Sequence, residues 1–372
     1  MREVVTFQFY PLPIQRRSWL VSRAATPTRS EVAKPAWAGT EDWLSRAVNV
    51  LIGTPFIYAV LKRQAKAVLQ RTAESRGIDW TGNVRALSDG GLQAYYAERT
   101  GVRYPEYYMR KFHAYDAGNL CWEAAYEAEP ATYAMALRVW PRERELSWRE
   151  AQRRLRYSFL EAVGAFHAAA ATTNALRVAI DIGCSVGVST RYLTEWMVRR
   201  APDSLSMRVY GVDLSPYFLA VARARQATGD IADAPVDRRR ASIEYVHAQA
   251  ETLPFADDTA DLVTLQFVLH ELPRTAARAI FPELVRVTRS GGTLAFVDND
   301  PRSPVIQNLP PALFTLMKST EPHSDDYYTF DVEAALRDTP GVVSVQVHET
   351  DPRHRTILCR VHKEADGRPL GV

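Results

Sequence analysis

The chain has 372 residues, of which 47% are hydrophobic, enough for a large core and for more than one structural unit. Its formal net charge of +3 is too close to neutral to indicate nucleic-acid binding. The cysteines Cys121, Cys184 and Cys359 lie far apart, which excludes a zinc ribbon, predicts no metal site and suggests a reducing compartment.

Residues 1–36 differ in composition from the rest of the chain. No acid occurs between Val4 and Ser30, whereas arginines alternate with serines and threonines there. This composition is typical of an organelle transit segment, and it also fits a disordered basic tail. Both interpretations stay open, and a compact apolar core of a secretory signal is absent.

Residues 37–172 show a helical pattern. Ser147 and Glu150 form a capping box that predicts the start of a long helix leading to the first strand. The apolar run 47–61 is interrupted by Pro55 and is shorter than the roughly 20 residues of a membrane span. It fits a buried hairpin better than an apolar face on a membrane, so we expect no span, while peripheral membrane contact stays open.

An apolar run from Val178 leads into a turn containing Asp181, Gly183, Ser185 and Gly187. This pattern predicts a strand, a tight turn and a helix that together approach a ligand closely. A carboxylate just before the turn would repel a pyrophosphate, but it would attract an amino group and a sulfonium cation. The pattern therefore favours S-adenosylmethionine over a dinucleotide.

Residues 181–187 resemble motif I of class I S-adenosylmethionine-dependent methyltransferases, with Ser185 where the family has glycine. Four further segments between residues 209 and 298 resemble the later strand motifs of that family, in the same order. The resemblance implies an α/β, Rossmann-like sheet of five parallel strands over residues 173–364. Two alternating segments, 341–348 and 356–362, predict a terminal antiparallel hairpin.

The resemblance also implies which residues bind S-adenosyl-L-methionine. Asp213 matches the acid that accepts the ribose hydroxyls at the end of the second strand. The full predicted cofactor site consists of Asp181, Gly183, Ser185, Gly187, Asp213, Leu214, Ala250, Glu251 and Phe267.

Methyl transfer needs a base only where the acceptor must lose a proton. His270 follows the fourth strand and is the first candidate for that base; capping of the next helix is the alternative. His323 is a second catalytic candidate, and a helical lid is expected over residues 310–319, followed by a helix over 331–336. The residues predicted to contact the acceptor are Tyr115, Asp298, Tyr327 and Tyr328, the last two on a closing loop.

Motifs of methyltransferases that act on nucleic-acid bases, glutamine amides and arginine are absent, which leaves a small-molecule acceptor methylated at oxygen, carbon or nitrogen. The segment 104–123 resembles uncharacterised methyltransferase-like proteins of plants, algae and cyanobacteria. That resemblance implies a chloroplast location, with the cytoplasm as the alternative. Two other functions stay open: a catalytically silent scaffold and a nicotinamide oxidoreductase.

Overall fold

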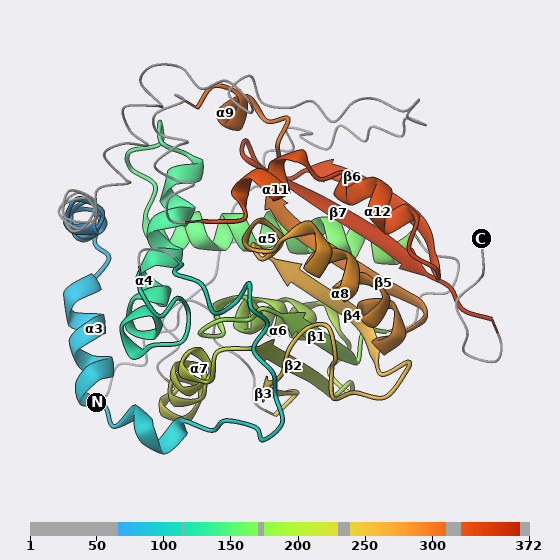
Figure 1. Cartoon of the computed structure of the whole chain (residues 1–372), viewed down its shortest axis with the longest axis horizontal. Helices are drawn as coiled ribbons and strands as arrows, with labels where there is room; N and C mark the ends of the chain where they lie inside the picture. Colours follow the sequence, from blue (N-terminus) through green and yellow to red (C-terminus); the bar gives the residue numbers. More distant parts are fainter. Residues whose placement is uncertain (1–65, 113–114, 170–174, 230–238, 310–320, 365–372) are drawn as a thin grey trace, which may run out of the picture.

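The computed structural model of this chain describes residues 66–112, 115–169, 175–229, 239–309 and 321–364 (Figure 1). The predicted transit segment, the apolar run 47–61 and the predicted lid over 310–319 lie outside these ranges.

A single sheet of seven strands organises the fold, in the order β3-β2-β1-β4-β5-β7-β6. The first five strands pair in parallel, β7 pairs antiparallel with β5, and β6 pairs antiparallel with β7. This arrangement confirms the predicted sheet and terminal hairpin. The strands are β1 (Val178–Ile182), β2 (Met207–Asp213), β3 (Ala241–His247), β4 (Ala260–Gln266), β5 (Thr288–Asn299), β6 (Val342–Glu349) and β7 (His354–Val361).

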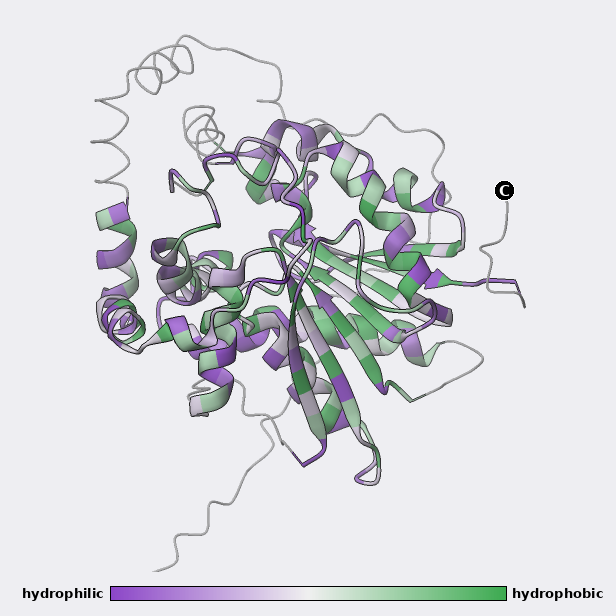
Figure 2. Cartoon of the chain, turned by 60° about the horizontal axis from the view of Figure 1, so that its bottom comes forward, coloured by the Kyte–Doolittle hydropathy of each residue, from purple (hydrophilic) through white to green (hydrophobic). Residues whose placement is uncertain are grey.

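Helices cover both faces of the sheet. Successive strand residues point to opposite faces, so Ala179 and Leu262 join one core, and Ile180 and Val263 join the other. Figure 1 shows α8 (Arg274–Val287) and α12 (Val332–Arg337) in front of the sheet, with α5 (Trp148–Ala168) behind it. Figure 2 shows hydrophobic residues along the strands, while the helices alternate between hydrophobic and hydrophilic residues. A parallel sheet buried on both faces accounts for this pattern.

The N-terminal helices pack onto the same core as the sheet. They comprise α3 (Trp80–Asp89), the short η1 (Leu92–Tyr95), α4 (Trp122–Val139) and α5, which begins at the predicted capping box of Ser147 and Glu150. Glu129 of α4 is buried and forms ion pairs with Arg191 and Arg225, each at 2.8 Å. These arginines belong to α6 (Val188–Arg200) and α7 (Pro216–Thr228), so the helical region and the sheet form one packed unit.

The carboxyl ends of the five parallel strands meet at one edge of the sheet. The 3-10 helix η2 (Leu269–Glu271) follows β4 there, and α9 (Pro304–Gln307) and α11 (Ser324–Thr329) follow β5 in the chain. In the described ranges, no helix is both long and apolar enough to cross a bilayer.

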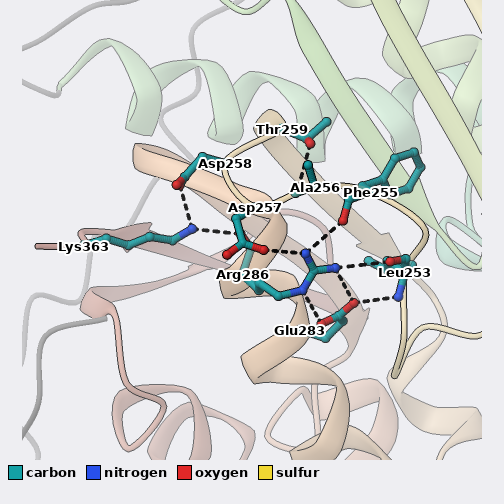
Figure 3. A network of polar contacts seen from close by, with 9 residues as sticks. All are labelled: Leu253, Phe255, Ala256, Asp257, Asp258, Thr259, Glu283, Arg286 and Lys363. Carbon is teal, nitrogen blue, oxygen red and sulfur yellow. Dashed lines mark hydrogen bonds and ion pairs between the residues drawn. The ribbon is translucent and has the colours of Figure 1, made fainter. Parts of the chain in front are cut away.

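The opposite, amino edge of the sheet is closed by a network around Arg286, at the end of α8 (Figure 3). Its guanidinium group donates to the carboxylates of Glu283 and Asp257 and to the carbonyls of Leu253 and Phe255. Nearby, Lys363 Nζ donates to Asp258 Oδ1 at 2.6 Å. These bonds fix the loop that precedes β4.

Candidate active site

The turn after β1 has the backbone shape that the sequence predicts. Gly183, Ser185 and Gly187 all have positive φ angles, of 68°, 49° and 80°. A side chain at Gly183 would meet Val268, and one at Gly187 would meet the ring of Tyr245. The glycines are therefore required by the backbone angle and by packing inside the protein, rather than by the approach of a ligand alone.

Asp181 does not lie on the surface of this turn. Its side chain is fully buried, and its oxygens accept hydrogen bonds from the hydroxyls of Ser189, Thr190 and Thr264 at 2.6–2.8 Å. The prediction that it contacts the cofactor therefore needs correction, because its oxygens are used to join α6 to β4. Burial raises the pKa of this carboxyl, and the hydroxyl donors counteract that effect.

Asp213 ends β2 beside the turn, as predicted. Its two carboxylate oxygens accept the backbone N–H groups of Ser185 at 2.7 Å and Ser215 at 2.8 Å. The neighbouring Leu214 carbonyl lies 3.0 Å from His247 Nε2. Burial raises the pKa of Asp213 to about 6, although these backbone donors favour the charged form. The carboxylate is thus held rigidly at the carboxyl edge, in the position expected for binding ribose hydroxyls.

A segment from the N-terminal region crosses this edge and contacts the end of β3. The Arg99 backbone N–H donates to His247 Nδ1 at 2.9 Å, and the Tyr107 hydroxyl donates to Glu251 Oε1 at 2.6 Å. The other oxygen of Glu251 is buried and has no partner within the described ranges. Tyr108 lies close enough to Asp213 for that charge to raise its pKa, in addition to the larger effect of burial. The residues 99–108 therefore cover the predicted cofactor site.

Several carboxyl groups share this edge. The pKa of Glu271 is raised to about 8, chiefly by burial; the charge of His270 opposes this rise, and the charges of Glu321, Asp213 and Asp298 contribute to it. Carboxylates that repel one another would be stabilised by a positive ligand. A sulfonium donor carries such a charge, whereas a pyrophosphate would add to the repulsion. The sequence analysis attributed the preference for a sulfonium cation over a pyrophosphate to Asp181 alone. The carboxyl groups of Glu271, Glu321, Asp213 and Asp298 account for that preference better.

His270 and Asp298 form a pair at the ends of β4 and β5. His270 Nδ1 lies 2.8 Å from Asp298 Oδ1, and the His270 backbone N–H donates to Asp298 Oδ2 at 3.1 Å. Burial lowers the pKa of His270, but the charge and hydrogen bond of Asp298 outweigh it and raise the pKa to about 10. The imidazole is therefore protonated at neutral pH, which alters its predicted role as a base. Asp298 is buried and positions His270, while its predicted contact with the acceptor stays a prediction.

His323 has the opposite electrostatic environment. Burial lowers its pKa, although a hydrogen bond with the Tyr107 backbone opposes that effect. Its Nε2 atom is buried without a hydrogen-bond partner in the described part of the chain. Its ring lies 6.2 Å from the ring of Tyr107. His323 is thus neutral at pH 7, as a base requires, and lies beside the covering segment.

Three tyrosines predicted to contact the acceptor have other roles. Tyr115 donates its hydroxyl hydrogen bond to Glu127 of α4 and lies beneath Lys66, so the structure does not bring it to the site. Tyr327 and Tyr328 lie in helix α11, not on a loop, and both are 2% exposed. The Tyr327 hydroxyl donates to the Asn299 carbonyl, and its ring lies 6.3 Å from the ring of His270. These two side chains support the site from the core.

The remaining predicted cofactor residues lie along the same edge. Ala250 is half-buried against the core behind the site. Phe267 follows β4 with a positive φ of 61°, and its ring lies 5.0 Å from that of His354 and beneath the guanidinium group of Arg156. The ring therefore faces α5 and β7. The predicted cofactor contact of Phe267 stays a prediction, because these contacts account for its ring by packing alone.

Residues 180–296 match the family described as "Methyltransferase domain". The chain is thus an enzyme in which residues 180–296 are similar to a methyltransferase domain. The match runs from β1 through β5 and includes the turn, Asp213 and the His270 segment. The cofactor of this enzyme domain is S-adenosylmethionine, and its five parallel strands and terminal hairpin are those predicted from the motifs.

Relatives of the methyltransferase domain include proteins named demethylmenaquinone methyltransferase. The one from Shouchella clausii (strain KSM-K16) is 30% identical over 132 residues, covering 35% of this chain and 49% of the relative. The one from Roseiflexus sp. (strain RS-1) is 35% identical over 130 residues, covering 35% of this chain and 46% of the relative. The chain thus spans about half the length of these relatives.

Solved structures with a similar fold are more distant in sequence. A SAM dependent methyltransferase from Aquifex aeolicus is 18% identical, with a TM-score of 0.39, covering 55% of this chain and 92% of that one. Phosphoethanolamine N-methyltransferase 2 from Haemonchus contortus, in complex with S-adenosyl-L-methionine, is 14% identical, with a TM-score of 0.43; coverage is 72% of this chain and 62% of that one.

The residues at the methyltransferase edge fit this cofactor. Asp213 offers a rigid carboxylate for hydroxyl groups, the half-partnered Glu251 lies after β3, and the carboxyl groups around Glu271 suit a cation. Sequence reasoning missed Tyr107, Tyr108 and His247. For the two tyrosines the signal was the density of aromatic residues before position 123, but the sequence pattern did not indicate which ring would reach the sheet.

Proposed function

We propose that this protein transfers a methyl group from S-adenosylmethionine to a small-molecule acceptor that has an ionisable hydroxyl group or an acidic carbon. The observation that carries the proposal is the His270–Asp298 pair at the carboxyl ends of β4 and β5, next to the edge that fits the cofactor. Ligands of open α/β sheets bind outside these strand ends. An acceptor with no proton to lose would have no use for such a pair.

When bound, S-adenosylmethionine supplies an electrophilic methyl group on a positively charged sulfur. The side chains of this protein orient the acceptor and control its proton. Neutral His323 accepts the acceptor's proton at its Nε2 atom, for which the described residues supply no partner, and protonated His270 donates a hydrogen bond that stabilises the resulting negative charge. Two groups whose pKa values are shifted in opposite directions are typical of an acid–base pair.

Reduced demethylmenaquinone, the acceptor in the names of the relatives above, represents the neutral hydroquinones in the test. Its ring hydroxyls are ionisable, as the two-histidine site requires. The alternative function is a catalytically silent scaffold. It would retain cofactor binding but would not turn over any acceptor.

Calorimetry with S-adenosylhomocysteine, combined with a labelled-donor assay, tests the proposal. We expect saturable binding that Asp213→Asn weakens at least tenfold, since a hydrogen-bonded charge contributes about 1.5–3 kcal/mol. Glu244→Gln, on the exposed face of β3, is the matched control. Binding without methyl transfer to any acceptor in a panel of phenols, hydroquinones and carbon acids would favour the scaffold.

We also propose that the protein acts in plastids, supported by the acid-poor, arginine-rich composition of residues 1–36. Fusing these residues to a fluorescent protein in plant cells tests the location. Fluorescence confined to chloroplasts is expected, and diffuse cytoplasmic fluorescence would contradict it.

A further inference from the structure

Arg353 lies at the carboxyl edge, on the side away from Asp213. It precedes β7, and its Nε atom donates to Asn299 Oδ1 at 3.0 Å, at the end of β5. Its terminal guanidinium nitrogens form no ion pair or hydrogen bond with any residue of the described ranges. The adjacent Arg355, by contrast, forms an ion pair with Glu333 at 2.9 Å. Arg353 thus holds a fixed charge whose two strongest donors remain available.

A second guanidinium group faces the same region. Arg138 lies in the last turn of α4, and no carboxylate in the described part of the chain pairs with it. Its Nη1 atom lies 3.8 Å from the sulfur of Met135. Loss of solvent and the positive charge of Arg353 both lower the pKa of Arg138. The charge of Arg353 thus disfavours the charged form of Arg138, and an anion bound near both groups would offset that effect.

Two buried side-chain amides, those of Gln152 and Gln266, lie further inside the protein. Gln152 of α5 is 0% exposed, and neither atom of its amide has a hydrogen-bond partner in the described ranges. One helical turn later, Arg156 Nη1 donates to Gln266 Oε1 at 2.9 Å, and the guanidinium group lies 5.2 Å from the Phe267 ring. Phe267 in turn contacts His354, the neighbour of Arg353. Buried amides nearly always have partners, so the Gln152 amide indicates a position for a polar ligand group.

We propose that the methyl acceptor is an anion, and that Arg353 and Arg138 bind its carboxylate or phosphate group while Gln152 binds a second polar group of the same molecule. The inference rests on the proposed function, because it names the substrate class of that site. Arginine binds both anions through two parallel hydrogen bonds. The carboxyl edge would then present acidic groups to the cationic methyl donor and basic groups to the anionic acceptor. Each binding site would therefore repel the ligand of the other site.

Three probes of similar shape test the acceptor class on protein saturated with S-adenosylhomocysteine. These are benzoate, phenyl phosphate and the neutral benzamide, titrated by NMR. At least one anion is expected to bind about tenfold more tightly than benzamide, and Arg353→Gln or Arg138→Gln should each remove most of that preference. Preference for benzoate indicates a carboxylate acceptor, and preference for phenyl phosphate indicates a phosphate. Equal binding of all three probes would overturn the inference.

Matched variants separate binding from folding. Arg353→Lys keeps the charge and should retain most of the preference, whereas an equal loss in Arg353→Lys and Arg353→Gln would show that the preference does not depend on charge. Arg149→Gln removes an exposed arginine that stacks on Trp148, 4.2 Å from the ring, and should change nothing. Failure of S-adenosylhomocysteine itself to bind would defeat the proposed function, while cofactor binding without anion preference would defeat this inference alone.

Discussion

The polar side chains at the two edges of the sheet differ in how many of their hydrogen-bonding atoms have partners. At the amino edge, Arg286 donates hydrogen bonds from all three of its guanidinium nitrogens, and the pKa of this group is raised, chiefly by its hydrogen bond with Glu283 (Figure 3). At the carboxyl edge, His323 and Gln152 have buried polar atoms without partners in the described ranges. The Arg286 network uses all of its donors within the protein, whereas His323 and Gln152 each retain a polar atom that a ligand could bind.

Backbone strain follows the same division. Two of the three non-glycine residues with positive φ in the described chain, Ser185 and Phe267, lie at the carboxyl edge. Such conformations cost about 1–3 kcal/mol each and persist only where the surrounding structure holds them; the third, Asp258, lies at the amino edge. The comparison suggests that the stability of the amino edge compensates for strain and repulsion at the other edge.

The largest expected effect comes from removing the imidazole at the carboxyl edge. We expect His270→Gln to lower the methyl-transfer rate by roughly 10²–10⁴, because a positioned acid–base group contributes that much. The affinity for S-adenosylhomocysteine should stay within about twofold, since His270 bonds Asp298 and not the cofactor residues. Initial rates and calorimetry measure the two quantities. His362→Gln, an exposed histidine after β7, is the control at the opposite edge, and a similar rate loss there would refute the contrast.

The pH profile should show two limbs. Activity should fall as pH drops below the lowered pKa of His323, because the base gains a proton. It should fall again as pH rises through about 10, because His270 then loses the proton that stabilises the acceptor's charge. Initial rates across the pH range measure this, and His323→Gln should remove the acidic limb. Activity that instead rises through pH 10 would make His270 the base.

At the amino edge, the expected effect is on stability alone. We expect Arg286→Gln to lower the free energy of unfolding by ~1–3 kcal/mol, toward the lower end because the side chain is partly exposed. Urea denaturation measures it, with Arg278→Gln on the exposed side of α8 as the control. The methyl-transfer rate of the folded variant should be unchanged. A changed affinity for S-adenosylhomocysteine would mean that the amino edge also serves binding.

The smallest effect concerns the strained turn. Ser185→Gly should raise the free energy of unfolding by up to ~1 kcal/mol, since a left-handed conformation costs a side-chain-bearing residue about 1–2 kcal/mol and the greater freedom of glycine when unfolded offsets part of it. Ser185→Ala keeps the Cβ atom and should show no gain. If both variants are destabilised equally, the hydroxyl group, and not the backbone angle, determines stability at this position.

The sequence was sufficient to predict what depends on local pattern. The capping box at Ser147 and the pairing of β6 with β7 follow from capping and alternation in the sequence, and the five parallel strands follow from the family resemblance. The site was predicted less completely, because its side chains depend on which element lies opposite. Asp181 turned inward because the hydroxyls of α6 and β4 surround it, and Tyr327 was expected on a loop, although it lies in a helix that packs against Asn299.

The role of His270 also depends on a side chain that the sequence pattern does not place. Its place after the fourth strand indicated a catalytic position, but its protonation state depends on Asp298, which lies on another strand. Spacing in a sequence does not reveal such a partner, whereas the register of β4 with β5 does.

Hydrogen–deuterium exchange with and without S-adenosylhomocysteine tests most directly whether the carboxyl edge is the functional one. Bound ligand should slow exchange in residues 183–188, 213–216 and 247–251 and leave residues 253–259 and 283–289 unchanged. Protection confined to the Arg286 network, or no protection at the turn after β1, would contradict the account.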